Sequence, residues 1–269
     1  MKKRRWAGKM GEAKDIKLPS AINEADMPEV ILVGDSHTLA LYQGCCALGI
    51  NAAILKSGGI HWNQGKIRIF APRRGRSPIL PALRPDIELL QTRMDRTDIF
   101  DGSVPVIASI GFHCGHLARA FGAYGHVAWP PPGGLAVSDD EPVLFASKAM
   151  IRAFIDDRRS THISLLRCIA SRCNLTVILP PRAPKNEKKI RFRHNIDALT
   201  AVIAERVTSY GISVYDPNAD FVGDDAILPW QWVNDDGFHG SPDYGKLVME
   251  RLIARGALGS ECEQRALEK

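Results

Sequence analysis

Five short runs rich in apolar and β-branched residues recur along the chain, and none of them alternates strictly between apolar and polar positions. The runs span 30–33, 52–55, 104–108, 175–179 and 212–215. Continuous apolar runs of this length are typical of strands that are covered on both faces. We therefore predict a mostly parallel sheet built from these five strands.

Helical spacing of apolar residues appears between most of the predicted strands. It predicts helices over 38–48, 148–171, 195–210 and 244–255. An alternation of strands and helices indicates an α/β fold with helices on both faces of the sheet. In such folds the functional groups collect in the loops that follow the carboxyl ends of the strands.

Length and composition narrow the class of protein. The chain has 269 residues, of which 45% are hydrophobic and 24% charged. These values are typical of one large globular domain, and they exclude a disordered, collagen-like or small disulfide-stapled chain. No run of about 18 apolar residues occurs, so we expect no integral membrane segment.

The net charge of +5 is concentrated at the start of the chain. Residues 1–20 hold seven basic and two acidic groups (7 − 2 = +5), so the remaining residues are neutral overall. A neutral body argues against a nucleic-acid partner. We predict a flexible basic tail over 1–27, one domain over 28–257 and a C-terminal tail over 258–269. The basic tail could also tether the protein weakly to an anionic surface.

The cysteines bear on the cellular compartment. None of the six forms a C-x-x-C pair, and no apolar segment follows the basic tip as it would in a secretion signal. We therefore expect reduced thiols and a cytoplasmic protein. The six residues are Cys45, Cys46, Cys114, Cys168, Cys173 and Cys262.

The first strand ends in the block Gly34-Asp35-Ser36-His37, directly before a predicted helix. A serine at a strand-to-helix turn exposes its hydroxyl, and the N–H groups at the start of the helix can face an oxyanion. Asp and Ser also cap helices for purely structural reasons. Ser36 is therefore a candidate nucleophile, and the alternative is that this block only caps the helix.

A second block, Asp236-Gly237-Phe238-His239, precedes the last helix. Its spacing lets the carboxylate reach one imidazole nitrogen while the other nitrogen faces outward. A serine nucleophile needs this arrangement, because a base takes its proton and a third group orients the base. The alternative is a helix start that Asp236 caps.

Together the two blocks resemble the SGNH/GDSL hydrolase superfamily, over about residues 28–257. The resemblance implies a three-layer α/β/α, flavodoxin-like fold with a five-stranded sheet. It also implies esterase, lipase, thioesterase or deacetylase activity that requires no cofactor. In that family pattern Ser36 is the nucleophile, His239 is the base and Asp236 orients the base.

The resemblance further implies an oxyanion hole. The family adds to the serine N–H a glycine after the second strand, which is Gly58 here with Gly59 as the neighbouring alternative. It also adds an asparagine after the third strand, where this chain has His113. A neutral imidazole can donate one N–H, so His113 could replace the amide. The expected donors are Ser36, Gly58 and His113.

Other residues leave alternatives open. The set His113, Cys114, His116 and His126 fits no standard zinc spacing, and we expect no metal. Aromatic side chains near the expected site could stack on a sugar, hold an acyl chain, or pack loops onto the body. They are Trp62, Trp129, Trp230 and Trp232. A basic run after the fourth strand could attract an anionic substrate or form a solvated helix start. It comprises Arg182, Lys185, Lys188, Lys189, Arg191 and Arg193.

The function that we expect is hydrolysis of a short-chain or acetyl ester, on a small molecule or a glycan, through a covalent acyl-enzyme. Two alternatives stay open. An O-acyltransferase would pass the acyl group to a glycan hydroxyl instead of water, and a non-catalytic module would only bind a glycan or lipid.

Overall fold

The computed structural model describes most of the predicted domain. The described residues are 27–58, 62, 83–112, 114–123, 125–130, 143–182, 190–221 and 227–259. The two predicted tails lie almost wholly outside them.

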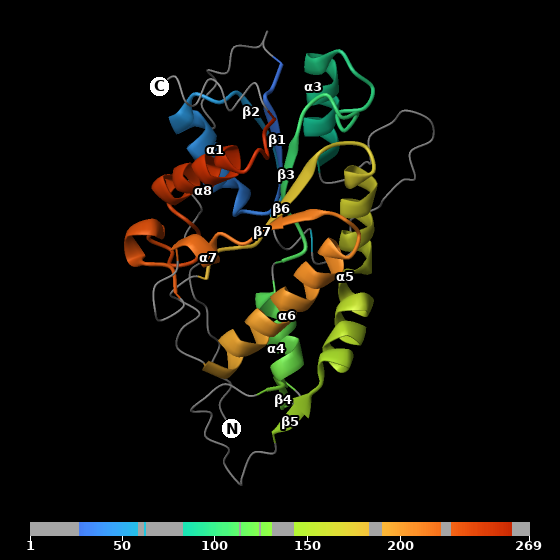
Figure 1. The fold of residues 1–269 in the computed structure, drawn as a ribbon, viewed down its shortest axis with the longest axis vertical. Helices are drawn as coiled ribbons and strands as arrows, with labels where there is room; N and C mark the ends of the chain where they lie inside the picture. Colours follow the sequence, from blue (N-terminus) through green and yellow to red (C-terminus); the bar gives the residue numbers. More distant parts are fainter. Residues whose placement is uncertain are drawn as a thin grey trace, which may run out of the picture.

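Five parallel strands form the central sheet, in the order β2-β1-β3-β6-β7 (Figure 1). The strands are β1 (Val30–Gly34), β2 (Ala52–Lys56), β3 (Val106–Ser109), β6 (Leu175–Ile178) and β7 (Ser213–Tyr215). Every residue of β1, β3 and β6 is buried, as continuous apolar runs require. The predicted α/β class and the flavodoxin-like order are confirmed.

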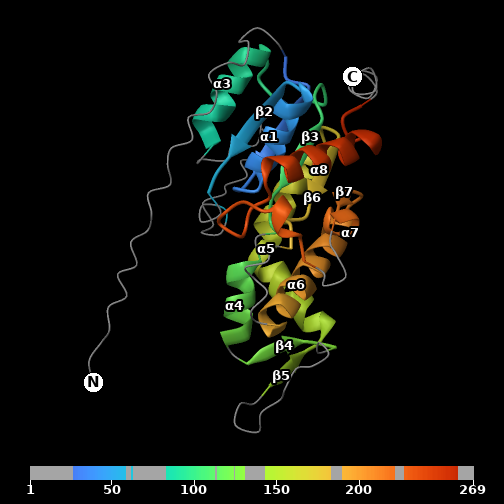
Figure 2. The same ribbon diagram turned by 90° about the vertical axis from the view of Figure 1, so that its left-hand side faces the viewer.

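Helices cover the sheet on both faces and produce three layers (Figures 1 and 2). Successive side chains of β1 face opposite ways, so Ile31 and Val33 join one core while Val30 and Leu32 join the other. The first core is completed by α3 (Arg84–Met94), α4 (Gly115–Ala123), α5 (Lys148–Ala170) and α6 (Ile190–Thr208). The second is completed by α1 (Thr38–Leu48) and α8 (Pro242–Ala254).

The structure adds elements that the sequence pattern did not predict. Besides α3 and α4 they are β4 (His126–Ala128), β5 (Leu144–Ala146), α7 (Asn218–Phe221) and the short 3-10 helix η3 (Trp230–Trp232). β4 and β5 pair in a small parallel sheet beyond α4 and α6, at the opposite end of the molecule from α3 (Figure 2). The side-chain amide of Asn195 holds β4, because it accepts from Ala128 N and donates to the carbonyl of His126.

The described part of the chain bears on two expectations from the sequence, namely reduced cysteines and the absence of a membrane-spanning helix. None of its five cysteines forms a disulfide; they are Cys45, Cys46, Cys114, Cys168 and Cys173. Among the described helices, none has the length and apolar character needed to cross a membrane.

The backbones of α1 and α8 touch at a pair of glycines. A Cβ atom on Gly245 would lie 1.8 Å from the carbonyl oxygen of Ala40, and one on Gly44 would lie 2.4 Å from backbone atoms of Gly245. Only glycine permits this approach. Because α1 follows Ser36 and α8 follows His239, the contact sets the relative position of the two segments that carry the site.

We predict that Gly245→Ala destabilises the protein by about 1–3 kcal/mol, because the added methyl group meets backbone atoms that cannot rotate away. Gly115→Ala is the matched control, since no atom lies within 4 Å of the Cβ position there. The control should stay within about 1 kcal/mol of the parent. Urea denaturation measures both. Equal stability of the two variants would contradict the proposed helix contact.

Candidate active site

Three predicted side chains form one chain of hydrogen bonds. Ser36 Oγ lies 2.7 Å from His239 Nε2, although the two residues are 203 positions apart in the sequence. His239 Nδ1 lies 2.5 Å from Asp236 Oδ2. This is the nucleophile–base–orienting-group geometry of a serine triad.

A buried aspartate holds the turn that carries Ser36. Asp35 is only 4% exposed, and its Oδ1 accepts from the backbone N–H of His37 at 2.9 Å and from Ser109 Oγ at 3.4 Å. The turn also passes very close to β3, since a Cβ on Gly34 would lie 2.5 Å from the carbonyl oxygen of Ser109. The Gly-Asp-Ser sequence therefore provides close packing, an anchor and a half-buried hydroxyl in consecutive residues.

A closed loop between η3 and α8 carries Asp236 and His239. Asn234 N–H donates to the carbonyl of His239 at 2.8 Å, and Gly237, with φ of 72°, donates its N–H to the carbonyl of Asn234. Ser241 caps α8 by accepting from the N–H of Tyr244. The alternative that Asp236 caps this helix is therefore wrong.

Electrostatics keep Asp236 ionised. Burial raises the pKa of this carboxyl, but hydrogen bonds from the His239 ring and from the N–H groups of His239 and Phe238 outweigh burial, so its pKa lies below the ordinary value. An ionised Asp236 accepts the Nδ1–H of His239, which leaves the Nε2 lone pair facing Ser36. The two side chains are 45% and 31% exposed, so water reaches this end of the triad.

The segments that carry Ser36 and Gly58 run side by side. The last registered pair of β1 and β2 is Gly34 with Lys56, and Ser36 and Gly58 each lie two residues beyond it. Neighbouring strands are about 4.8 Å apart, so these two expected donors come from adjacent segments.

The third expected donor, His113, and the alternative glycine, Gly59, lie outside the described residues. The segment just before His113 is described, and a buried arginine holds it. Arg159 of α5 is 2% exposed and donates from Nε to the carbonyl of Gly111 at 3.0 Å. The sequence carried a signal for this role, because Arg159 follows Ile151 and Ile155 at helical spacing and so lies on the apolar stripe of α5.

His162 is buried beneath the same loop. Its Cβ lies 3.5 Å from the Cβ position of Gly111, and the side chain is 5% exposed. Burial, together with the positive charge of Arg159, lowers the pKa of His162 to about 4 from the ordinary 6.5.

We predict that stability falls as the pH drops from 6.5 to 4. Over this range the unfolded chain binds a proton on His162 and the native chain does not, so protonation favours unfolding. The loss attributable to this residue should reach at most about 3 kcal/mol. Denaturation of the parent and of His162→Gln at several pH values measures it. An identical pH slope in both proteins would contradict the assignment.

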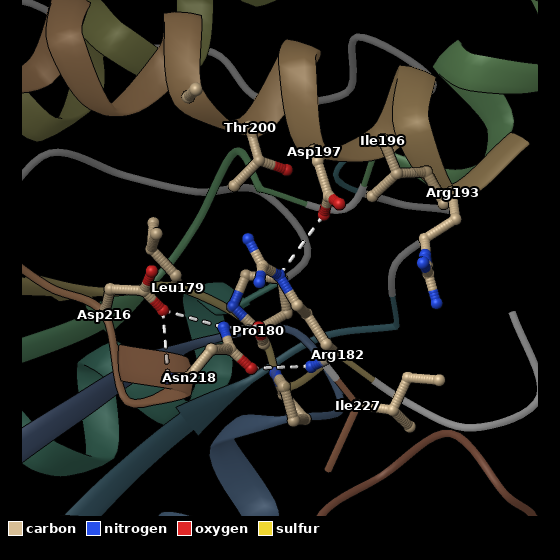
Figure 3. Close-up of a pocket in the computed structure, with 12 residues that line it drawn as sticks. Leu179, Pro180, Arg182, Arg193, Ile196, Asp197, Thr200, Asp216, Asn218 and Ile227 are labelled. Atoms are coloured by element: carbon tan, nitrogen blue, oxygen red, sulfur yellow. Dashed lines mark hydrogen bonds and ion pairs between the residues drawn. The ribbon is translucent and has the colours of Figure 1, made fainter. Parts of the chain in front are cut away.

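A pocket lies at the carboxyl ends of β6 and β7 (Figure 3). Leu179 and Pro181 line both this pocket and a narrow recess next to His37 and Gly240. Asn218 fixes the pocket wall, because its side chain accepts from Arg182 N–H and donates to the carbonyl of Pro180 and to the carboxylate of Asp216.

The polar rim of this pocket carries both signs of charge. Arg182 pairs with Asp197 at 3.3 Å, and Arg193 lies along the same wall (Figure 3). Burial raises the pKa of Asp197, although Arg182 and Arg193 oppose the rise. These arginines belong to the predicted basic run, of which Lys185, Lys188 and Lys189 lie outside the described residues. Such a rim can donate to and accept from the hydroxyl groups of a ligand.

The four tryptophans differ in their surroundings. Trp62 is 4% exposed and packs in the core, where its Nε1 donates to the carbonyls of Gly34 and Ser57 at 3.1 and 3.2 Å. Trp129 and Trp230 are 61% and 65% exposed. The packing alternative is therefore right for Trp62.

The described residues contain no group of three or more His, Cys, Asp or Glu side chains that could hold a metal ion. The metal alternative considered from the sequence includes His113, which lies outside the described residues.

Comparison with known proteins gave matches in structure alone. No family model and no curated protein matches the chain. A lipase/acylhydrolase of Enterococcus faecalis is 15% identical over 85% of this chain and 94% of that chain, with a TM-score of 0.38. A GDSL-like lipase of Bacteroides thetaiotaomicron is 16% identical over 85% and 86%, with a TM-score of 0.43. An extracellular lipase of Streptomyces rimosus is 14% identical over 82% and 98%, with a TM-score of 0.44.

All three of these structures are lipases or acylhydrolases.

Proposed function

We propose that the protein is a serine-dependent hydrolase of a short-chain or acetyl ester. The observation that carries the proposal is the hydrogen-bond chain from Ser36 Oγ through the His239 ring to Asp236, with distances of 2.7 and 2.5 Å. A serine hydroxyl is a weak nucleophile unless an oriented base accepts its proton, and this chain supplies both the base and its orientation.

In the first half of the proposed reaction, Ser36 Oγ attacks the ester carbonyl carbon while its proton passes to His239 Nε2. The imidazolium that forms is stabilised by ionised Asp236. The carbonyl oxygen becomes an oxyanion, which accepts hydrogen bonds from the N–H groups of Ser36 and Gly58 and from the ring of His113. His239 then protonates the leaving alcohol, and the acyl group stays on Ser36.

In the second half, His239 Nε2 takes a proton from water as the water oxygen attacks the acyl carbon and forms the same kind of oxyanion. The bond between the acyl carbon and Ser36 Oγ then breaks, Oγ takes the proton back from His239, and the carboxylic acid leaves. The exposure of His239 and Asp236 supports water as the acceptor, which favours hydrolysis over acyl transfer to a glycan. The narrow recess beside His37 suits a short acyl group. The wider pocket lined by Arg182 and Asp216 suits a hydroxylated alcohol portion.

We predict that Ser36→Ala abolishes both the hydrolysis of p-nitrophenyl acetate and the labelling by a fluorophosphonate probe, because Ser36 is the serine paired with His239 in the described part of the chain. Labelling followed by mass spectrometry locates the modified residue. Circular dichroism confirms that the variant folds. Labelling that maps to another serine, or turnover close to the parental rate, would contradict the assignment.

His239→Ala should cost nearly as much activity as Ser36→Ala, and the double variant should be little worse than either, because the residues act as a unit. Asp236→Asn should retain more activity, since this side chain is 45% exposed and water can partly replace its contact. Losses that simply multiply in the double variant would mean that Ser36 and His239 do not share a mechanism.

The proposed role of His113 as an oxyanion donor can be tested with the kinetics of His113 variants. His113→Ala should lower kcat by about 10²–10³-fold, the usual effect of removing one oxyanion donor, with little change in KM. His113→Asn should recover part of the loss, since the amide also donates. Kinetics with and without EDTA separate this role from metal binding, for which chelation alone would lower activity. A packing role would lower the melting temperature and leave kcat intact.

A further inference from the structure

The indole N–H of Trp62 is shared between two carbonyl groups at the edge of the site. It donates to Gly34 O at 3.1 Å and to Ser57 O at 3.2 Å. Gly34 ends β1 two residues before Ser36, and Ser57 follows β2 directly before Gly58. One buried side chain therefore holds both segments from which the oxyanion N–H groups come.

The hydrogen bond to Ser57 fixes the direction of the Gly58 N–H. The carbonyl of Ser57 and the N–H of Gly58 belong to the same peptide unit, which is planar and trans. The two bonds therefore point in opposite directions, and holding the oxygen toward Trp62 turns the Gly58 N–H away from it. A hydrogen bond accepted by the carbonyl also polarises the peptide and makes its N–H a stronger donor.

The other carbonyl ties the segment after β2 to the nucleophile turn. Gly34 O accepts from Trp62 Nε1 and also from the N–H of Ser57 at 3.0 Å. The following N–H, of Asp35, donates to the carbonyl of Ser109 in β3 at 3.2 Å. The start of the Ser36 turn is thus held from β2 on one side and from β3 on the other. Movement of the Trp62 ring would shift both oxyanion segments together.

We propose that Trp62 is a positioning residue for the oxyanion hole: its N–H sets the orientation of the Gly58 N–H relative to Ser36. The inference rests on the proposed esterase function and extends it to a residue that makes no contact with the reacting atoms. Orientation of the donor matters most when the carbonyl oxygen becomes an anion, so the effect belongs to the transition state.

The test replaces Trp62 with β-(3-benzothienyl)alanine, which keeps the bicyclic shape and substitutes sulfur for the N–H. With p-nitrophenyl acetate we expect kcat to fall about tenfold, the usual scale for one net hydrogen bond, while KM changes less than twofold. The inhibition constant of phenylboronic acid should rise by a similar factor, because its tetrahedral serine adduct places an oxygen in the hole. Trp62→Phe should show the same pattern with a larger loss of thermal stability.

The same replacement at Trp230, which is 65% exposed, is the matched control and should leave kcat and inhibition unchanged. An unchanged kcat and inhibition constant in the Trp62 isostere would overturn the proposal, as would a lower melting temperature with parental kcat. Absence of turnover and of fluorophosphonate labelling in the parent protein would instead overturn the esterase function itself.

Discussion

The contact between the backbones of α1 and α8 is the constraint on which the site depends. Ser36 and His239 precede these helices on segments that are far apart in the sequence. Their 2.7 Å contact exists because Gly44 and Gly245 let the helices approach to a distance that any side chain would prevent. The apolar core on that face of the sheet then holds the pair in place. The geometry of the proposed catalytic site is therefore a consequence of helix packing.

Four loops at the carboxyl edge of the sheet are stabilised in the same way. In each of these loops a buried polar side chain makes a hydrogen bond with a backbone group. Asp35 holds the loop after β1, Trp62 the loop after β2, Arg159 the loop after β3 and Asn218 the loop after β6. Backbone N–H groups can serve an oxyanion only if they are fixed before the charge develops, and buried hydrogen bonds in a low-dielectric interior provide that rigidity.

The side chains that fix the backbone of the site differ in solvent exposure from the proposed base and its carboxylate. The groups that fix the backbone are almost fully buried, whereas His239 and Asp236 remain partly open to solvent. An open base can exchange protons with water, as the proposed deacylation requires, and the pocket at the ends of β6 and β7 has apolar walls with a rim of both charges. A rigid loop edge with an accessible base is consistent with the proposed ester hydrolysis.

The sequence alone predicted the five-stranded parallel sheet, which the structure confirms, and it also picked out the residues of the proposed triad, because both depend on local patterns. Strands buried on both faces leave continuous apolar runs, and Gly-Asp-Ser-His and Asp-x-x-His each carry their spacing within four residues. Only the tertiary structure decided how the site is held together. Trp62 bonds to Gly34, Arg159 bonds to Gly111 and Asn195 holds β4, at separations of 28, 48 and 67 positions. Apolar spacing indicates that a residue such as Arg159 is buried, but nothing in the chain identifies its partner, since the partners are backbone groups that every residue possesses.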